Sequence, residues 1–181
     1  EGYGEDNFTG DLYGRYSFGN QYERLLDETF IREITLPIIE EDLRIAGILD
    51  GIRNLDTLDV GTGRQALCMA LLNAKSVHHY DLSKFHVSRF SKIIKEKYGQ
   101  LPIRTTYLDI CKSKLPKEAY DFVYLNGIVQ HFSDTSAGLK NCAASVRLGG
   151  RIWVYFYRSG TFKWFVCSMI RRLLHAQYLD D

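Results

Sequence analysis

Two short runs of this chain carry the residue types that could hold a nucleoside. In the first run, Asp59 precedes a turn that contains Gly61 and Gly63, and the second run is centred on Asp81. Glycines let the backbone adopt angles, and approach a ligand to distances, that a Cβ atom would block. A carboxylate at the end of the following strand can accept hydrogen bonds from both hydroxyls of a ribose. Together the two runs predict a site for a nucleoside cofactor.

The elements predicted around these runs would bring them to one edge of a sheet. Leu58 and Val60 are the apolar positions of a strand covered on both faces, and a helix is predicted to begin near Ala66. Free N–H groups at the start of that helix point back at the glycine turn. Ser83 is a good N-cap for a second helix, which runs to about Tyr98. Strands and helices go on alternating, which predicts an α/β fold with a parallel sheet and helices on both faces.

Two cofactors fit the glycine turn. The run Gly61-Thr62-Gly63-Arg64-Gln65-Ala66 satisfies the dinucleotide pattern G-x-G-x-x-G/A, which favours an NAD-linked oxidoreductase. Asp59 argues against it, because a carboxylate beside the turn would repel a pyrophosphate. The same carboxylate suits a cationic amino-acid tail. S-adenosyl-L-methionine (SAM) has an ammonium group, a sulfonium and no phosphate, so it is the preferred cofactor.

With these residues in place, the chain resembles the class I SAM-dependent methyltransferases, in their small-molecule branch. The family's first motif is written around D-x-G-x-G, and further segments continue the resemblance in order over roughly residues 55–157. These segments are Ile103–Ile110, Tyr120–Gly127, Ile128–Phe132 and Val146–Val154. The chain departs from the family at Gln65, where a third glycine is common. The resemblance implies a doubly wound, mostly parallel Rossmann-like sheet with an N-terminal helical cap.

The resemblance also implies roles for individual residues. Asp59 would order the glycine turn and bond to the ammonium group, Asp81 would bind the ribose, and Asp109 would bond to the adenine amino group. The full set of implied cofactor contacts is Asp59, Gly61, Thr62, Gly63, Asp81, Leu82, Asp109, Ile110, Asn126 and Gly127. Asn126 and His131 are the candidates for a catalytic part, and no metal is implied. His78 and His79 lie inside the second predicted strand and are interpreted as structural.

Three regions are predicted along the chain: an arm and helical cap over residues 1–50, a cofactor-binding core over 51–157, and a C-terminal amphipathic helix over 158–181. Helical spacing is seen over 21–35 and 38–50, with Pro37 expected to break or kink this segment into two helices and Gly51 to end the second. A later helix is expected to run from Asp134 or Thr135 to Arg147. Residues 13–18 are the candidate lid over the acceptor pocket.

The C-terminal region leaves the function open in one respect. Seven apolar residues between Phe162 and Leu174 share one helical face, with basic residues off it. The family's sheet normally has two more strands, so the chain is either C-terminally shortened or a variant with a reduced sheet. A non-catalytic subunit that docks on a partner or a membrane surface through 162–174 is therefore the alternative to an enzyme.

Composition and charge limit the classes of partner and substrate that are expected for this chain. A net charge of +1 over 181 residues gives no drive toward nucleic acid. The four cysteines form no C-x-x-C pair, and no transmembrane stretch or signal peptide is recognised, so a cytoplasmic protein is expected. The motifs of amino-group and cytosine methyltransferases are absent. A small-molecule or glycan-type acceptor is expected, with its attacking atom (O, N or C) and the oligomeric state left open.

Overall fold

The computed structural model describes residues 26–156 and 169, and its centre is a five-stranded sheet. The strands are β1 (Asp56–Val60), β2 (Ser76–Asp81), β3 (Ile103–Tyr107), β4 (Tyr120–Asn126) and β5 (Val146–Tyr155). Their order across the sheet is β3-β2-β1-β4-β5, and every neighbouring pair is parallel. The order reverses beside β1, so the crevice at the carboxyl ends of β1 and β4 is the expected ligand site of such a sheet.

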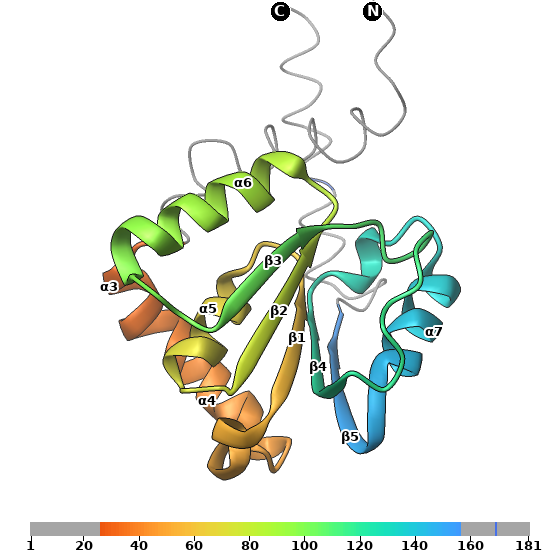
Figure 1. Ribbon diagram of the computed structural model, residues 1–181, viewed down its shortest axis with the longest axis horizontal. Helices are drawn as coiled ribbons and strands as arrows, with labels where there is room; N and C mark the ends of the chain where they lie inside the picture. The colour runs from red at the N-terminus through yellow and green to blue at the C-terminus, as the bar shows by residue number, and fades with distance from the viewer. Residues whose placement is uncertain (1–25, 157–168, 170–181) are drawn as a thin grey trace, which may run out of the picture.

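Helices cover both faces of the sheet, as Figure 1 shows. The helical elements are α3 (Glu28–Phe30), η3 (Ile31–Thr35), α4 (Leu36–Ile45), η4 (Leu49–Asn54), α5 (Arg64–Leu71), α6 (Lys84–Ile93), η5 (Ile94–Tyr98), η6 (Val129–His131) and α7 (Thr135–Ser145). The elements α3 to α6 lie on one side, and α7 lies on the other. The predicted α/β architecture is therefore confirmed. Among the described residues, none of the helices has the length and apolar character needed to cross a membrane.

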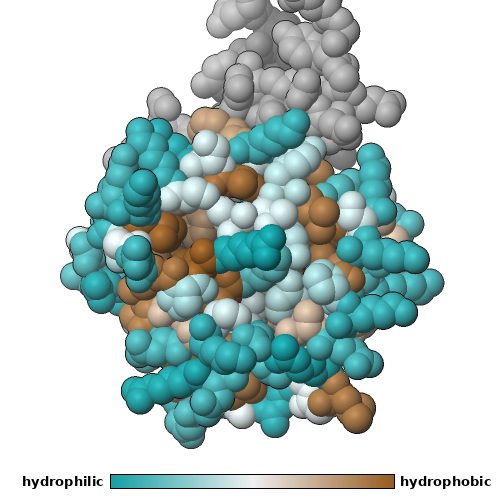
Figure 2. Space-filling model, in the orientation of Figure 1, coloured by the Kyte–Doolittle hydropathy of each residue, from teal (hydrophilic) through white to brown (hydrophobic). Residues whose placement is uncertain are grey.

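Each face of the sheet has its own core. On the face beneath α4, α5 and α6, the core includes Leu43, Met69, Phe90 and Phe122, all fully buried. On the face beneath α7, buried side chains such as Leu58, Val123 and Leu125 pack with Ile110 and Leu115, two residues from the segment between β3 and β4. Hydrophilic side chains surround smaller hydrophobic areas on the outer surface shown in Figure 2.

A row of polar and aromatic side chains crosses the whole sheet on the α5 face. The pairing register places Thr105, His79, Asp59, Tyr124 and Trp153 side by side, one from each strand. Asp59, His79 and Tyr124 are fully buried. Buried polar groups must find hydrogen-bond partners within the protein, so this row constrains its surroundings more than an apolar row would.

The predicted break at Pro37 is wrong. Helical structure continues from Glu28 to Ile45, and the five residues before Leu36 form the π-helix η3, in which the Leu36 N–H donates to the Ile31 carbonyl. Proline lacks an N–H, and its ring collides with a carbonyl of the preceding turn. A wider π turn at that place accommodates the ring without ending the helix.

The predicted end of the second helix at Gly51 is also wrong. The helix α4 ends at Ile45, and Gly47 follows with a φ of +67°. The Ile48 N–H donates to the Leu43 carbonyl (3.0 Å), and the Gly47 N–H donates to the Arg44 carbonyl (2.9 Å). This Schellman pattern needs a left-handed residue, which glycine provides. Gly51 lies inside the 3₁₀ helix η4 instead.

The third correction concerns α7, which ends at Ser145 and not at Arg147. Its last carbonyls accept hydrogen bonds from the N–H groups of Glu118 and Ala119, which closes the helix against the start of β4. The Gly149-Gly150 pair then forms an irregularity within β5, between the pairs Tyr120–Val146 and Phe122–Arg151. The expected lid (13–18) and the C-terminal amphipathic helix (162–174) fall outside the described residues, Met169 apart.

Candidate functional site

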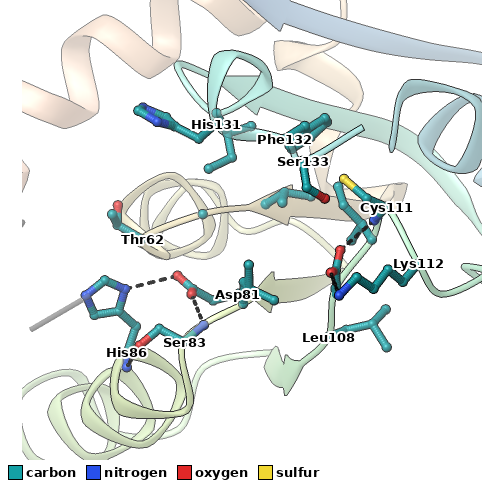
Figure 3. A pocket seen from close by; sticks show the side chains of 16 residues that line it. Thr62, Asp81, Ser83, His86, Leu108, Cys111, Lys112, His131, Phe132 and Ser133 are labelled. Carbon is teal, nitrogen blue, oxygen red and sulfur yellow. Dashed lines mark hydrogen bonds and ion pairs between the residues drawn. The ribbon is translucent and has the colours of Figure 1, made fainter. Parts of the chain in front are cut away.

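A cavity of about 300 Å³ opens at the carboxyl ends of the central strands, where the glycine turn and Asp81 meet. Its walls come from the ends of β1 and β2, from the start of α6, and from the segments that follow β3 and β4. Figure 3 shows Thr62 and His131 toward one end and Cys111 and Lys112 toward the other. Seven of the sequence-predicted residues line this cavity, namely Gly61, Thr62, Asp81, Leu82, Asp109, Ile110 and His131. The volume lies at the lower end of the range for small-ligand pockets.

The glycine turn is held from beneath by Asp59 and His79. The Ala66 N–H donates to Asp59 Oδ2 (3.1 Å), which ties the turn to the first turn of α5. His79 Nε2 donates to the Gly61 carbonyl (2.5 Å), and its Nδ1 lies 2.6 Å from the Thr105 hydroxyl. Burial lowers the pKa of His79, so the ring is neutral and accepts the threonine hydrogen at Nδ1. The turn therefore has a fixed shape before any ligand binds.

Asp59 itself is fully buried, and one of its oxygens is unpaired. Oδ1 has no hydrogen-bond partner among the described residues. Burial raises the pKa of the carboxyl from 3.8 to about 7, and the Ala66 N–H offsets part of that rise. An orphaned buried carboxylate oxygen is an unfavourable arrangement unless a cation or donor completes it. Asp59 does not line the main cavity, and the structure shows its turn-ordering contact directly.

Gly63 has a packing role rather than a place on the cavity. It is the N-cap of α5 with a φ of +82°, a conformation that side chains other than glycine rarely adopt. A Cβ atom there would lie 2.8 Å from the Phe90 ring. Gly61, in contrast, lines the cavity with a φ of +127°.

Asp81 is held by contacts that the sequence did not reveal. The Ser83 N–H donates to Asp81 Oδ1 (2.6 Å), and Nδ1 of His86 lies 3.3 Å from Oδ2 (Figure 3). The predicted N-cap at Ser83 is confirmed, because its hydroxyl accepts from the His86 N–H. His86 lines the cavity as well, together with His131. The sequence does contain a signal for the position of His86, because this histidine lies in the first helical turn after the capping serine.

The far end of the cavity combines apolar side chains with an ion pair at its edge, in which Lys112 Nζ lies 3.8 Å from Asp109 Oδ2. Ile110, Leu108 and Phe132 contribute apolar surface. Asp109 forms a turn, because its Oδ1 accepts from the Cys111 N–H (2.9 Å). A flat heterocycle between apolar side chains, with an acceptor at its rim, fits such a space.

Asn126 ends β4 and Gly127 follows it, and neither is among the residues that line the cavity. The Asn126 side-chain amide donates to the Tyr124 hydroxyl (3.0 Å), and the Gly127 carbonyl accepts from the Gln130 amide (2.6 Å). His78 bonds to Tyr120 and Thr106, in agreement with its structural interpretation.

Comparison with known proteins gives one family match. A family model described as a methyltransferase domain matches residues 58–154, more than half of the chain. The ubiquinone biosynthesis O-methyltransferase of Bradyrhizobium sp. (strain ORS 278) is 27% identical over 124 residues, which are 67% of this chain and 46% of that protein. The chain thus spans less than half the length of the curated relative that it matches.

Solved structures share the fold. Magnesium protoporphyrin IX methyltransferase from Synechocystis PCC 6803, solved with bound SAH, aligns with a TM-score of 0.68 at 18% identity, over 90% of this chain and 76% of that one. A SAM-dependent methyltransferase from Aquifex aeolicus aligns with a TM-score of 0.56 at 14% identity, over 71% and 66% of the two chains. At these identities the likeness concerns the fold alone, and it confirms the predicted Rossmann-like sheet.

Proposed function

This chain belongs to the methyltransferase domain family, and from that premise we propose that it binds SAM and transfers a methyl group to a small-molecule acceptor. The observation that carries the proposal is the cavity that joins Gly61 of the glycine turn to the buried carboxylate of Asp81. The names of two proteins described above support a small acceptor, since one refers to ubiquinone biosynthesis and the other to magnesium protoporphyrin IX. A glycan-type metabolite is compatible with the same site.

The residues that line the cavity suit the nucleoside part of the proposed cofactor. Asp81 would accept hydrogen bonds from the ribose hydroxyls, and Gly61 and Thr62, which line the same cavity, would offer backbone beside them. Leu82 and Ile110 would flank the adenine, with Asp109 as acceptor for its amino group. The unpaired Oδ1 of Asp59 suits the ammonium group at the other end. When bound, SAM supplies an electrophilic methyl group on its sulfonium.

The protein's own contribution to the reaction is mainly alignment. Holding two reactants in line and excluding water removes a large part of the barrier to a displacement at carbon. His131 lies on the cavity wall, where it could accept a proton from an alcohol or phenol acceptor. A positioned base of this kind contributes about 10²–10⁴-fold to the rate. Asn126, at the end of β4, would hold the cofactor or the acceptor through its side-chain amide group.

Calorimetry with S-adenosylhomocysteine and NAD⁺ tests the proposal. We expect one S-adenosylhomocysteine to bind per chain, and NAD⁺ not to bind. Asp81→Ala should weaken that binding by about 100-fold or more, since two hydrogen bonds to a charged group are lost. Asp50→Ala removes an exposed carboxylate from η4 and is the matched control.

Three outcomes would contradict the assignment. Preferred binding of NAD⁺ would point to an oxidoreductase, and equal affinity in Asp81→Ala would refute the placement of the ribose. Tight binding of SAM would favour the non-catalytic subunit if no acceptor in a broad screen led to the production of S-adenosylhomocysteine.

A further inference from the structure

The buried hydroxyl of Tyr124 connects the helix α4 to the end of β4. Tyr124 is fully buried, and its hydroxyl donates to Asp42 Oδ2 on α4. The same oxygen accepts from Nδ2 of Asn126 (3.0 Å). The Tyr124 ring is stacked on Trp153 of β5, with an interplanar angle of 4° and centroids 6.4 Å apart. The cofactor contacts and the proton transfer proposed above use Asn126 but assign no role to Asp42, Tyr124 or Trp153.

The chemistry of the three groups fixes the orientation of the Asn126 amide. A carboxylate can only accept, so the single hydrogen of the Tyr124 hydroxyl is committed to Asp42. Burial and the Asp42 bond raise the pKa of Tyr124, so the hydroxyl keeps that hydrogen. The phenolic oxygen can then only accept, and Asn126 must present its NH₂ group to it. Oδ1 of Asn126 is therefore the atom left for a ligand, as an acceptor.

The position of Asn126 indicates which ligand group would use that acceptor. Asp59 pairs with Tyr124 in the sheet, and Asn126, whose amide bonds the Tyr124 hydroxyl, follows two residues further along β4 on the same face. Asp59 Oδ1 is itself an unpaired acceptor. Two acceptors on adjacent strand ends suit a group with several N–H donors and a positive charge.

We propose that Asp42 and Tyr124 are positioning residues, which hold Asn126 with its Oδ1 toward the ammonium group of the cofactor's amino-acid end. This inference rests on the proposed function, since it names a further contact of the same ligand. It also assigns a role to α4, which would set the orientation of a site residue through Asp42.

The test compares two ligands that differ only at that end. S-adenosylhomocysteine carries the amino-acid group, and 5′-methylthioadenosine lacks it. In Tyr124→Phe we expect the affinity for S-adenosylhomocysteine to fall about three- to tenfold, the effect of one hydrogen bond, and the affinity for 5′-methylthioadenosine to stay unchanged. Tyr120→Phe is the matched control, because it removes a hydroxyl from the same strand on the opposite face.

A double-mutant cycle separates positioning from a general structural role. If Tyr124 acts through Asn126, Tyr124→Phe has no further effect on binding in an Asn126→Ala background. Asp42→Leu is a second variant of similar size. Its side chain cannot accept a hydrogen bond, which frees the tyrosine hydrogen to turn toward Asn126, and it should reproduce the selective loss. Equal losses for both ligands, additive losses in the cycle, or no loss at all would overturn the inference.

Side-chain amide NMR keeps this inference testable without any ligand. The Asn126 NH₂ signals, identified by their disappearance in Asn126→Ala, should exchange slowly in the wild type and rapidly in Tyr124→Phe. Identical exchange in the two proteins would refute the orientation. If the wild type failed to bind S-adenosylhomocysteine, the proposed function would fall, and the NMR result would still decide the arrangement of the three side chains.

Discussion

Replacing Asp59 by asparagine would isolate the effect of a buried carboxyl group in the glycine turn. The substitution preserves size, and the asparagine oxygen can still accept from the Ala66 N–H, which now donates to Asp59 Oδ2 at 3.1 Å. It removes the charge. What changes is therefore the dependence of stability on pH, more than the shape of the turn.

The sign and size follow from the pKa of the buried group. Burial raises the pKa of Asp59 from 3.8, the value in the unfolded chain, to about 7 in the folded protein. The stability that this carboxyl contributes is therefore fully present below pH 3.8, where it is protonated in both states. That contribution is lost as the pH rises through about 7, because the folded protein holds a proton that the unfolded chain releases. The free energy of unfolding should fall by about 4 kcal/mol over the whole window, with about 2–3 kcal/mol of the loss between about pH 5 and pH 8.

Urea unfolding of both proteins at a series of pH values measures this effect. Groups other than Asp59 titrate equally in the wild type and in Asp59→Asn. The difference between their curves of unfolding free energy against pH therefore isolates the contribution of Asp59. Parallel curves between pH 5 and pH 8 would refute the raised pKa. A companion measurement rests on the proposed ammonium contact: S-adenosylhomocysteine should bind the wild type more tightly as the pH rises through about 7, and Asp59→Asn should lose that trend.

Three further changes have defined outcomes. Gly63→Ala should lower the free energy of unfolding by about 2–4 kcal/mol in urea, from the strained φ and the collision with Phe90, and Phe90→Leu should restore part of it; equal stability of Gly63→Ala and wild type would contradict this. Burial raises the pKa of Cys142 to about 12, so iodoacetamide should modify Cys111 on the cavity wall before Cys142. Mass spectrometry measures the order of modification, and the reverse order would contradict this prediction. Hydrogen bonds lower the pKa of Asp56 from 3.8 to about 2, so Asp56→Asn should cost about 1–2 kcal/mol of unfolding free energy above pH 4, and that difference should vanish as the pH falls through about 2.

The positions that could be predicted from sequence are those fixed by local spacing. Gly61 directly follows one buried strand and Asp81 ends the next, and strand ends of a parallel sheet meet at one edge. The turn and the carboxylate were therefore brought together without knowledge of the tertiary contacts. Ser83 as an N-cap was equally local, because a capping hydroxyl bonds within its own first turn.

The residues that the sequence did not reveal act across strands. His79 supports the turn through Gly61, which follows β1, and through Thr105 on β3, so its role depends on a register that the sequence does not state. Tyr124 depends on a helix that begins more than eighty residues earlier in the chain. The helix ends were misplaced for a related reason, since the end at Ile45 depends on which of two nearby glycines adopts the left-handed conformation.

The polar row across the sheet has a consequence for how the strands find their partners during folding. A slip of two residues between parallel strands leaves every side chain on its own face, so the apolar positions of β1 and β4 would tolerate it. The polar row would not tolerate such a slip, because His79 would move away from the Thr105 hydroxyl and the Gly61 carbonyl. Each buried polar group left without a partner costs about 1–3 kcal/mol. The side chains that shape the ligand site thus also discriminate against misaligned sheets. An apolar replacement of the whole row would be expected to gain stability and to lose the uniqueness of the fold.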